Sequence, residues 1–150
     1  MSQLSSFPDD FVPDIRLSKT LARNAMGHLA SAERAANGAM DNAVLHGVAI
    51  AIELLLKANL LQVATTDTWN RVQIRHDLDK AAQYAERAGL ALPQGLERVI
   101  AQLHPHFQRG GFRRDIARSW PSGFALEACA ITRQLAHAVF DRAHQDAHSS

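Results

Sequence analysis

The stretch that decides the fold runs from residue 42 to residue 63, NAVLHGVAIAIELLLKANLLQV. Wound as a helix, it is apolar on nearly every side and is interrupted by few polar residues, among them His46, Glu53 and Lys57. A helix that is apolar all round needs protein cover on all sides. The stretch therefore predicts the central helix of a bundle, with Leu55 among its most buried residues.

Other segments carry apolar or small residues at steps of three or four, the period of an amphipathic helix. They cover residues 17–38, 77–89, 93–105 and 122–143. Asp77 and Ser122 are suited to cap helix N-termini, Gly89 follows a helix end, and Pro93 and Pro105 start and end a helix. Residues 64–75 read as a connection with room for a short turn of helix. We expect an all-α, up-and-down bundle of about five helices.

Size and composition are those of a single domain. The chain has 150 residues, 47% of them hydrophobic and 21% charged, so it can form one ordinary core but has no room for two domains. Residues 1–16 lack a sustained period and predict an N-terminal tail, which can fold back through Phe7 and Phe11. Residues 17–148 form the predicted domain.

Charge and cysteine content exclude several classes. A net charge of +1 gives no field over the whole protein, so a nucleic acid would have to be bound locally. The single cysteine, Cys129, lies in an apolar run and is expected in the core. The N-terminus has neither a basic start nor an apolar signal region, which favours a cytoplasmic protein with no membrane contact.

Common catalytic and metal-binding motifs are absent. The chain contains no GxGxxG, GxxxxGK[ST], HExxH, GxSxG or paired CxxC, which argues against dinucleotide, P-loop, zincin, hydrolase-elbow and zinc-ribbon sites. Eight histidines occur without cysteine partners or a supporting spacing of carboxylates. We therefore expect no cofactor and no metal.

The most distinctive pattern is an E-x-x-L-K-A core on the central helix followed by an H-D-L helix start. Its residues are Glu53, Leu56, Lys57 and Ala58, then His76, Asp77 and Leu78. In this pattern the chain resembles the HEPN family (higher eukaryotes and prokaryotes nucleotide-binding) over roughly residues 17–90. The resemblance is weaker afterwards, where GGFRRDI stands in place of an R-Y-P element. The resemblance implies a homodimeric helical bundle that binds a nucleotide or RNA. The family includes metal-free ribonucleases of toxin type, so the resemblance also allows that activity.

The resemblance also implies a catalytic R-x4-6-H motif. Arg23, Asn24 and His28 spell R-N-x-x-x-H, but they lie on the first helix, whereas the family motif belongs near the start of the last one. On the last helix, Arg133 and His137 are one residue too close. Arg23 and His28 are the catalytic candidates, although they lie about 140° apart around a helix and would converge only across an interface.

Glu53 and Lys57 stand four residues apart on an otherwise apolar helix, where either charge would be costly if buried alone. Two interpretations follow. In one, they form a structural polar cluster with His76 and Asp77. In the other, Lys57 and His76 contact a phosphate or a nucleotide.

Arginines gather between residues 109 and 118, where Arg109, Arg113 and Arg114 are interleaved with Phe112 and two glycines. Such a loop can clamp phosphates while a ring stacks on a base. It is the preferred RNA-binding surface, and intramolecular ion pairs are the alternative. A rival to the whole RNA hypothesis is a non-catalytic interaction module, which dimerises and pairs with a partner such as a nucleotidyltransferase-like protein.

Overall fold

The structure is a computed structural model, and it describes residues 4–36, 41–108 and 120–148. These residues form helices joined by turns and contain no strand, so the all-α prediction is confirmed. The helices are α1 (Ile15–Ala35), α2 (Asp41–Val63), α3 (Asp67–Gln73), α4 (Leu78–Arg87), α5 (Leu96–Gln108) and α6 (Phe124–His148). The described residues form six helices rather than five, because the connection between residues 64 and 75 contains α3.

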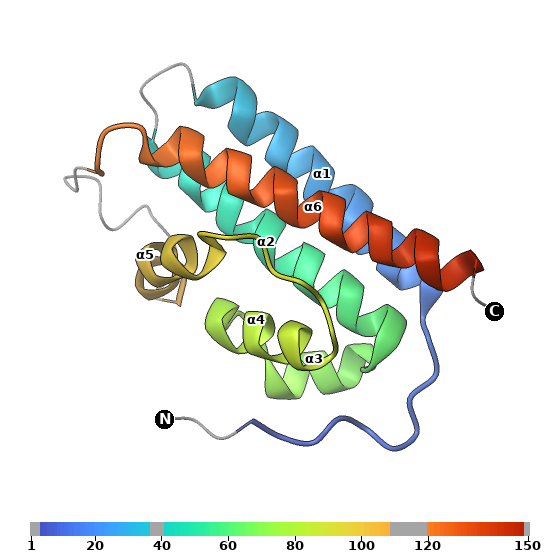
Figure 1. The fold of residues 1–150 in the computed structure, drawn as a ribbon. Coiled ribbons are helices and arrows are strands. Elements are labelled where there is room, and N and C mark those ends of the chain that lie inside the picture. Colours follow the sequence, from blue (N-terminus) through green and yellow to red (C-terminus); the bar gives the residue numbers. More distant parts are fainter. Residues whose placement is uncertain (1–3, 37–40, 109–119, 149–150) are drawn as a thin grey trace.

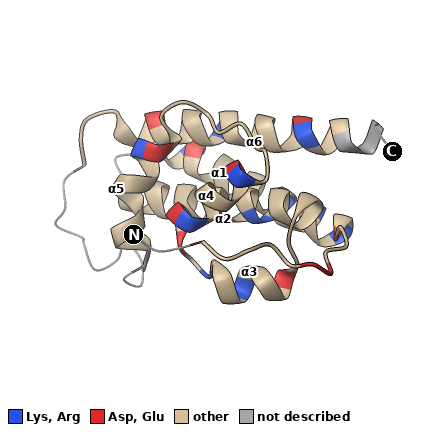
Figure 2. Ribbon diagram, turned by 60° about the horizontal axis from the view of Figure 1, so that its bottom comes forward, with Lys and Arg blue, Asp and Glu red and all other residues tan. Residues whose placement is uncertain are grey.

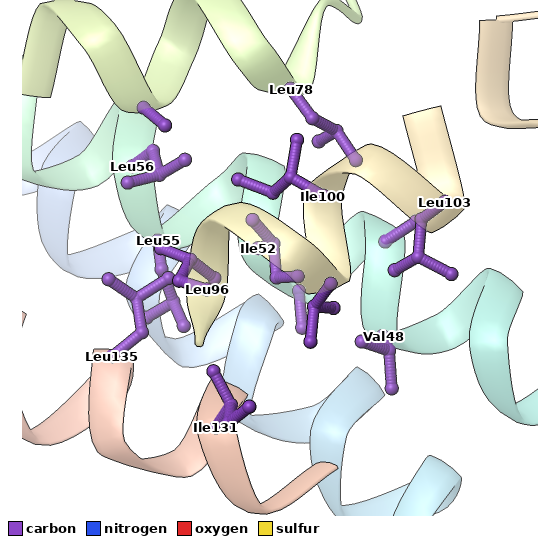
Figure 3. Close-up of a cluster of buried hydrophobic side chains, with 14 of the residues drawn as sticks. Val48, Ile52, Leu55, Leu56, Leu78, Leu96, Ile100, Leu103, Ile131 and Leu135 are labelled. Carbon is purple, nitrogen blue, oxygen red and sulfur yellow. The ribbon is translucent and has the colours of Figure 1, made fainter. Parts of the chain in front are cut away.

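The long helices α1, α2 and α6 lie alongside one another, and the shorter α3, α4 and α5 lie together on one side of α2 (Figure 1). The central position expected for α2 is confirmed. Leu55 is fully buried, and it packs among leucines, isoleucines and valines from α2, α4, α5 and α6 (Figure 3). By length and composition α2 could cross a membrane, with a mean hydropathy of 1.7, but 72% of its apolar window is buried within the fold.

Small side chains let α1 lie close against α2. The buried face of α1 is made largely of alanines, including Ala25 and Ala32, and a Cβ added at Gly47 on α2 would lie 3.6 Å from that of Ala32. The hydroxyl of Ser18 donates a hydrogen bond of 2.7 Å to the carbonyl of Ala58 on α2. Close packing on one face leaves the opposite face of α1 to solvent.

Helix boundaries follow the expected caps in part. Asp77 accepts a hydrogen bond from the backbone N–H of Lys80 at 2.9 Å, and Gly89 has a φ of 101° after the end of α4, as predicted.

Pro93 lies before α5 rather than in its first turn, and α5 continues through Pro105 to Gln108. The prediction that Pro105 ends this helix is wrong. Because proline has no backbone N–H, Pro105 cannot donate the helical hydrogen bond to the carbonyl of Ala101. Ala101 is exposed, so water can donate to that carbonyl instead.

The last helix, α6, begins at Phe124, two residues after Ser122, and runs to His148 rather than ending near Ala143. Its inner face buries Leu135 and Cys129, which confirms the core position predicted for the cysteine. Burial raises the pKa of the Cys129 thiol to about 11, and the nearby Glu33 adds to this shift. The thiol is therefore protonated at neutral pH.

Residues 4–14, here called the N-terminal strap, fold back onto α3 and α4. The backbone N–H of Ser5 donates to the hydroxyl of Tyr84 at 2.7 Å, and the indole N–H of Trp69 donates to the carbonyl of Ser6 at 3.3 Å. The Phe7 ring lies 5.8 Å from that of Trp69 and 5.9 Å from that of Tyr84. The contact through Phe7 is confirmed, and it adds the strap to the packed structure.

Candidate functional site

The structure brings Glu53, Lys57 and His76 together in one polar cluster. Glu53 is only 7% exposed, on the side of α2 that faces the α3–α4 turn. Its Oε1 accepts from Nδ1 of His76 at 2.7 Å, and its Oε2 accepts from the ammonium of Lys57 at 3.3 Å. Because an ionised carboxylate only accepts, Nδ1 is the protonated nitrogen of the His76 ring.

The turn between α3 and α4 explains why Lys57 is drawn into this cluster. Arg75 has a φ of 55°, a left-handed conformation that is uncommon for a residue other than glycine. Its backbone carbonyl accepts a short hydrogen bond from the Lys57 ammonium. Asp77 follows in the same turn and caps α4, and its Oδ1 lies 3.7 Å from Nε2 of His104 on α5.

These contacts favour the structural interpretation of the cluster. The Lys57 side chain is 14% exposed, and its ammonium already faces a carboxylate and a carbonyl. Two of the three N–H donors of the ammonium are therefore used within the protein, which leaves at most one for a phosphate. The His76 ring is 73% exposed and lies 6.0 Å from the ring of Phe107, so this ring alone can meet a ligand without rearrangement.

The arginine-rich loop is the RNA-binding surface that the sequence predicts. Arg109, Arg113 and Arg114 lie outside the described residues, so its proposed role stays a prediction.

Arg23 and His28 are both on α1 and both exposed. Five residues of α-helix separate them, which turns their side chains about 140° apart. The structure does not bring them together within one chain, and no described histidine contacts Arg23. On α6, Arg133 is occupied by Glu33 on α1 rather than by a histidine.

A row of cations on α1 was not recognised in the sequence. The row, here called the α1 stripe, comprises Arg16, Lys19, Arg23 and Arg34, all exposed. At 100° per residue they fall within about 60° of the helix circumference, along about 27 Å of axis. No described carboxylate lies within salt-bridge distance of any of them. The spacing was readable from the sequence, but their exposure depended on which face of α1 meets α2.

Elsewhere the charges are more evenly balanced. Basic and acidic segments lie together on α3 (Figure 2), where Arg71 pairs with Asp67 at 3.0 Å. Arg98 on α5 pairs with Glu127 on α6. The one acidic residue of α1, Glu33, faces Arg133 and therefore does not offset the stripe.

Within the described ranges, no group of three or more His, Cys, Asp or Glu side chains has the geometry of a metal site. Comparisons of the chain with models of protein families, with curated protein sequences and with solved structures find no match.

Proposed function

We propose that this chain is a HEPN-like helical domain that binds single-stranded RNA along the α1 stripe. The observation that carries the proposal is the set of four exposed cations in one line with no carboxylate partner among the described residues. Backbone phosphates dominate the affinity of proteins for nucleic acids, and unpaired cations are the groups that bind them.

The chemistry of the stripe suits phosphate oxygens. Arg16, Arg23 and Arg34 offer planar guanidinium groups, which hold their charge at any physiological pH and can donate two parallel hydrogen bonds. Small residues, Thr20, Gly27 and Ser31, lie between the cations on the same side of the helix, and none of the three is buried. A strand of RNA can therefore approach the helix closely.

The proposed activity is binding rather than cleavage. Metal-free cleavage needs a base and a cation that converge on one phosphate. Arg23 and His28 diverge on one chain, so cleavage would require a second copy that supplies the complementary residue. The homodimer that the HEPN resemblance implies is measured by light scattering, and a monomeric mass at micromolar concentration would rule out such a composite site.

The test of RNA binding is the salt dependence of oligouridine affinity, followed by fluorescence anisotropy. Single strands lose about 0.7 in log-log slope per phosphate contact, so four contacts predict a slope near −2.8. Replacing Arg16 and Arg34 together by glutamine should reduce the slope to about −1.4 and weaken binding.

A matched control is the Arg71→Gln, Arg98→Gln double variant. It removes the same charge from two exposed arginines that are already paired with Asp67 and Glu127. Its slope should stay near that of the parent chain. A third variant, Arg113→Ala with Arg114→Ala, tests the loop. If it alone flattens the slope, RNA binds the loop and the stripe proposal is wrong.

A further inference from the structure

A groove lies between the N-terminal end of α1 and the C-terminal end of α6, which are side by side in Figure 1. Its volume is about 780 Å³, within the range of about 300–1,000 Å³ typical of small-molecule sites. Most of the lining is apolar, with Met26 on α1 and Val139 and Phe140 on α6 among the residues that form it. This groove is distinct from the polar cluster at the α3–α4 turn.

Large apolar side chains are exposed at this groove. Ile15 is 41% exposed and Phe140 is 43% exposed, and both line it. Val12, three residues before the start of α1 at Ile15 and next to the lining residue Pro13, is 72% exposed. Exposed apolar side chains gathered around a hollow are typical of ligand sites. An apolar ligand group would remove them from water.

One side of the groove is basic. Lys19 and Arg23 line it, and no carboxylate does. They stand four residues apart, which makes them neighbours on the helix surface, and like charges in that arrangement repel each other. An anion between them would relieve this repulsion. Ser18 and Gln62 are the polar uncharged residues of the lining.

We infer that the groove binds a small molecule with an aliphatic body and one anionic head, such as a medium-chain carboxylate or alkyl phosphate. The body lies against Met26, Val139 and Phe140, and the head lies between Lys19 and Arg23. Lys19 and Arg23 also belong to the α1 stripe, but the inference does not rest on RNA binding, because most of the residues that line the groove lie outside the stripe.

The groove favours such a ligand over a second copy of the chain. Stable dimers need about 20–30 residues on each side, whereas the exposed large apolar side chains that line the groove are Ile15 and Phe140. A base or a peptide would also need several hydrogen-bonding groups inside the groove. The Ser18 hydroxyl already donates to Ala58, and the Gln62 amide lies 3.5 Å from the carbonyl of Ala143.

The probes are hexanoate, octanoate and decanoate below their micelle concentrations, with 1-octanol as the neutral match, measured by isothermal titration calorimetry. Each buried methylene should tighten binding about fourfold. Octanoate should bind about tenfold or more tightly than octanol, because its head gains charge-assisted hydrogen bonds.

Two sets of variants separate the head from the body. Lys19→Gln with Arg23→Gln should bring octanoate down to the affinity of octanol while leaving octanol binding unchanged. Phe140→Ala should weaken the binding of both probes. Because Phe140 is exposed, we expect the variant to fold. Val72→Ala, an exposed apolar residue on α3, is the matched control and should change nothing.

Equal binding of octanoate and octanol to the parent chain, or no dependence on chain length, would overturn the inference. So would light scattering that shows a dimer which Phe140→Ala dissociates, because a second copy then covers the groove. Arg16 and Arg34 lie outside the groove, so their double variant should keep full octanoate affinity whether or not the chain binds RNA.

Discussion

Arg133 on α6 donates two hydrogen bonds to the carboxylate of Glu33 on α1, at 2.9 Å from Nε and 2.6 Å from Nη2. This bidentate pair joins two helices that are 100 residues apart in the sequence. The hydrogen bonds from Arg133 lower the pKa of Glu33, and the same contact raises the pKa of Arg133. The pair also takes the one carboxylate of α1 out of reach of the α1 stripe.

The Glu33–Arg133 pair predicts a pH-dependent contribution to stability. Because the folded pKa of Glu33 is lowered from 4.5, the stabilisation is present above that value and is lost as the pH falls through the folded pKa. The Arg133 side chain is 40% exposed and that of Glu33 is 34% exposed, both over a third, which limits the effect to about 0.2–1 kcal/mol. Urea denaturation should show Glu33→Gln less stable than the parent chain at pH 7 and equal to it near pH 2. An equal difference at both pH values would contradict the prediction.

Leu55→Ala should destabilise the protein by about 2–5 kcal/mol, because Leu55 is fully buried at the centre of the core and its truncation leaves a cavity. Chemical denaturation measures the loss. Leu126→Ala is the matched control, since Leu126 on α6 is 56% exposed. A loss below about 1 kcal/mol for Leu55→Ala would show that α2 is not central.

Lys57→Ala should lower stability by about 1–3 kcal/mol, because it removes a donor from the buried Glu53 carboxylate and from the Arg75 carbonyl. RNA affinity should stay unchanged after correction for the folded fraction. Arg71→Ala removes an exposed cation from a surface pair and should cost less than about 0.5 kcal/mol. A loss of RNA binding by folded Lys57→Ala would instead favour the phosphate-contact interpretation of the cluster.

Phe7→Ala should destabilise the fold by about 1–3 kcal/mol, less than the full range for a buried phenylalanine, because Phe7 is half-buried against Trp69 and Tyr84. The urea midpoint is the measurement. Phe11→Ala provides the control, since Phe11 is also half-buried but does not pack against the core cluster. Equal losses for the two variants would show that the strap acts without the specific ring contacts of Phe7.

Much of the fold was predictable because the apolar period and the caps are local properties. An apolar stretch such as residues 42–63, interrupted by His46, Glu53 and Lys57, predicts a core helix, and Asp77 and Gly89 mark helix ends through their own backbone and side-chain chemistry. The continuation of α5 through Pro105 was not predictable from that residue alone. The free-energy cost of the missing hydrogen bond depends on whether the carbonyl of Ala101 is accessible to water, and tertiary packing decides that.

The sequence by itself determined an all-helical domain, the central position of α2 and the residues of the polar cluster at Glu53, Lys57 and His76. Tertiary structure alone decided that Lys57 is occupied by the Arg75 carbonyl, that Arg133 is held by Glu33, and that a groove opens between α1 and α6. Helical periodicity says which residues share a face, but which face meets which neighbour depends on packing between distant segments. The charges left without partners, and the hollows left between helices, follow only from that packing.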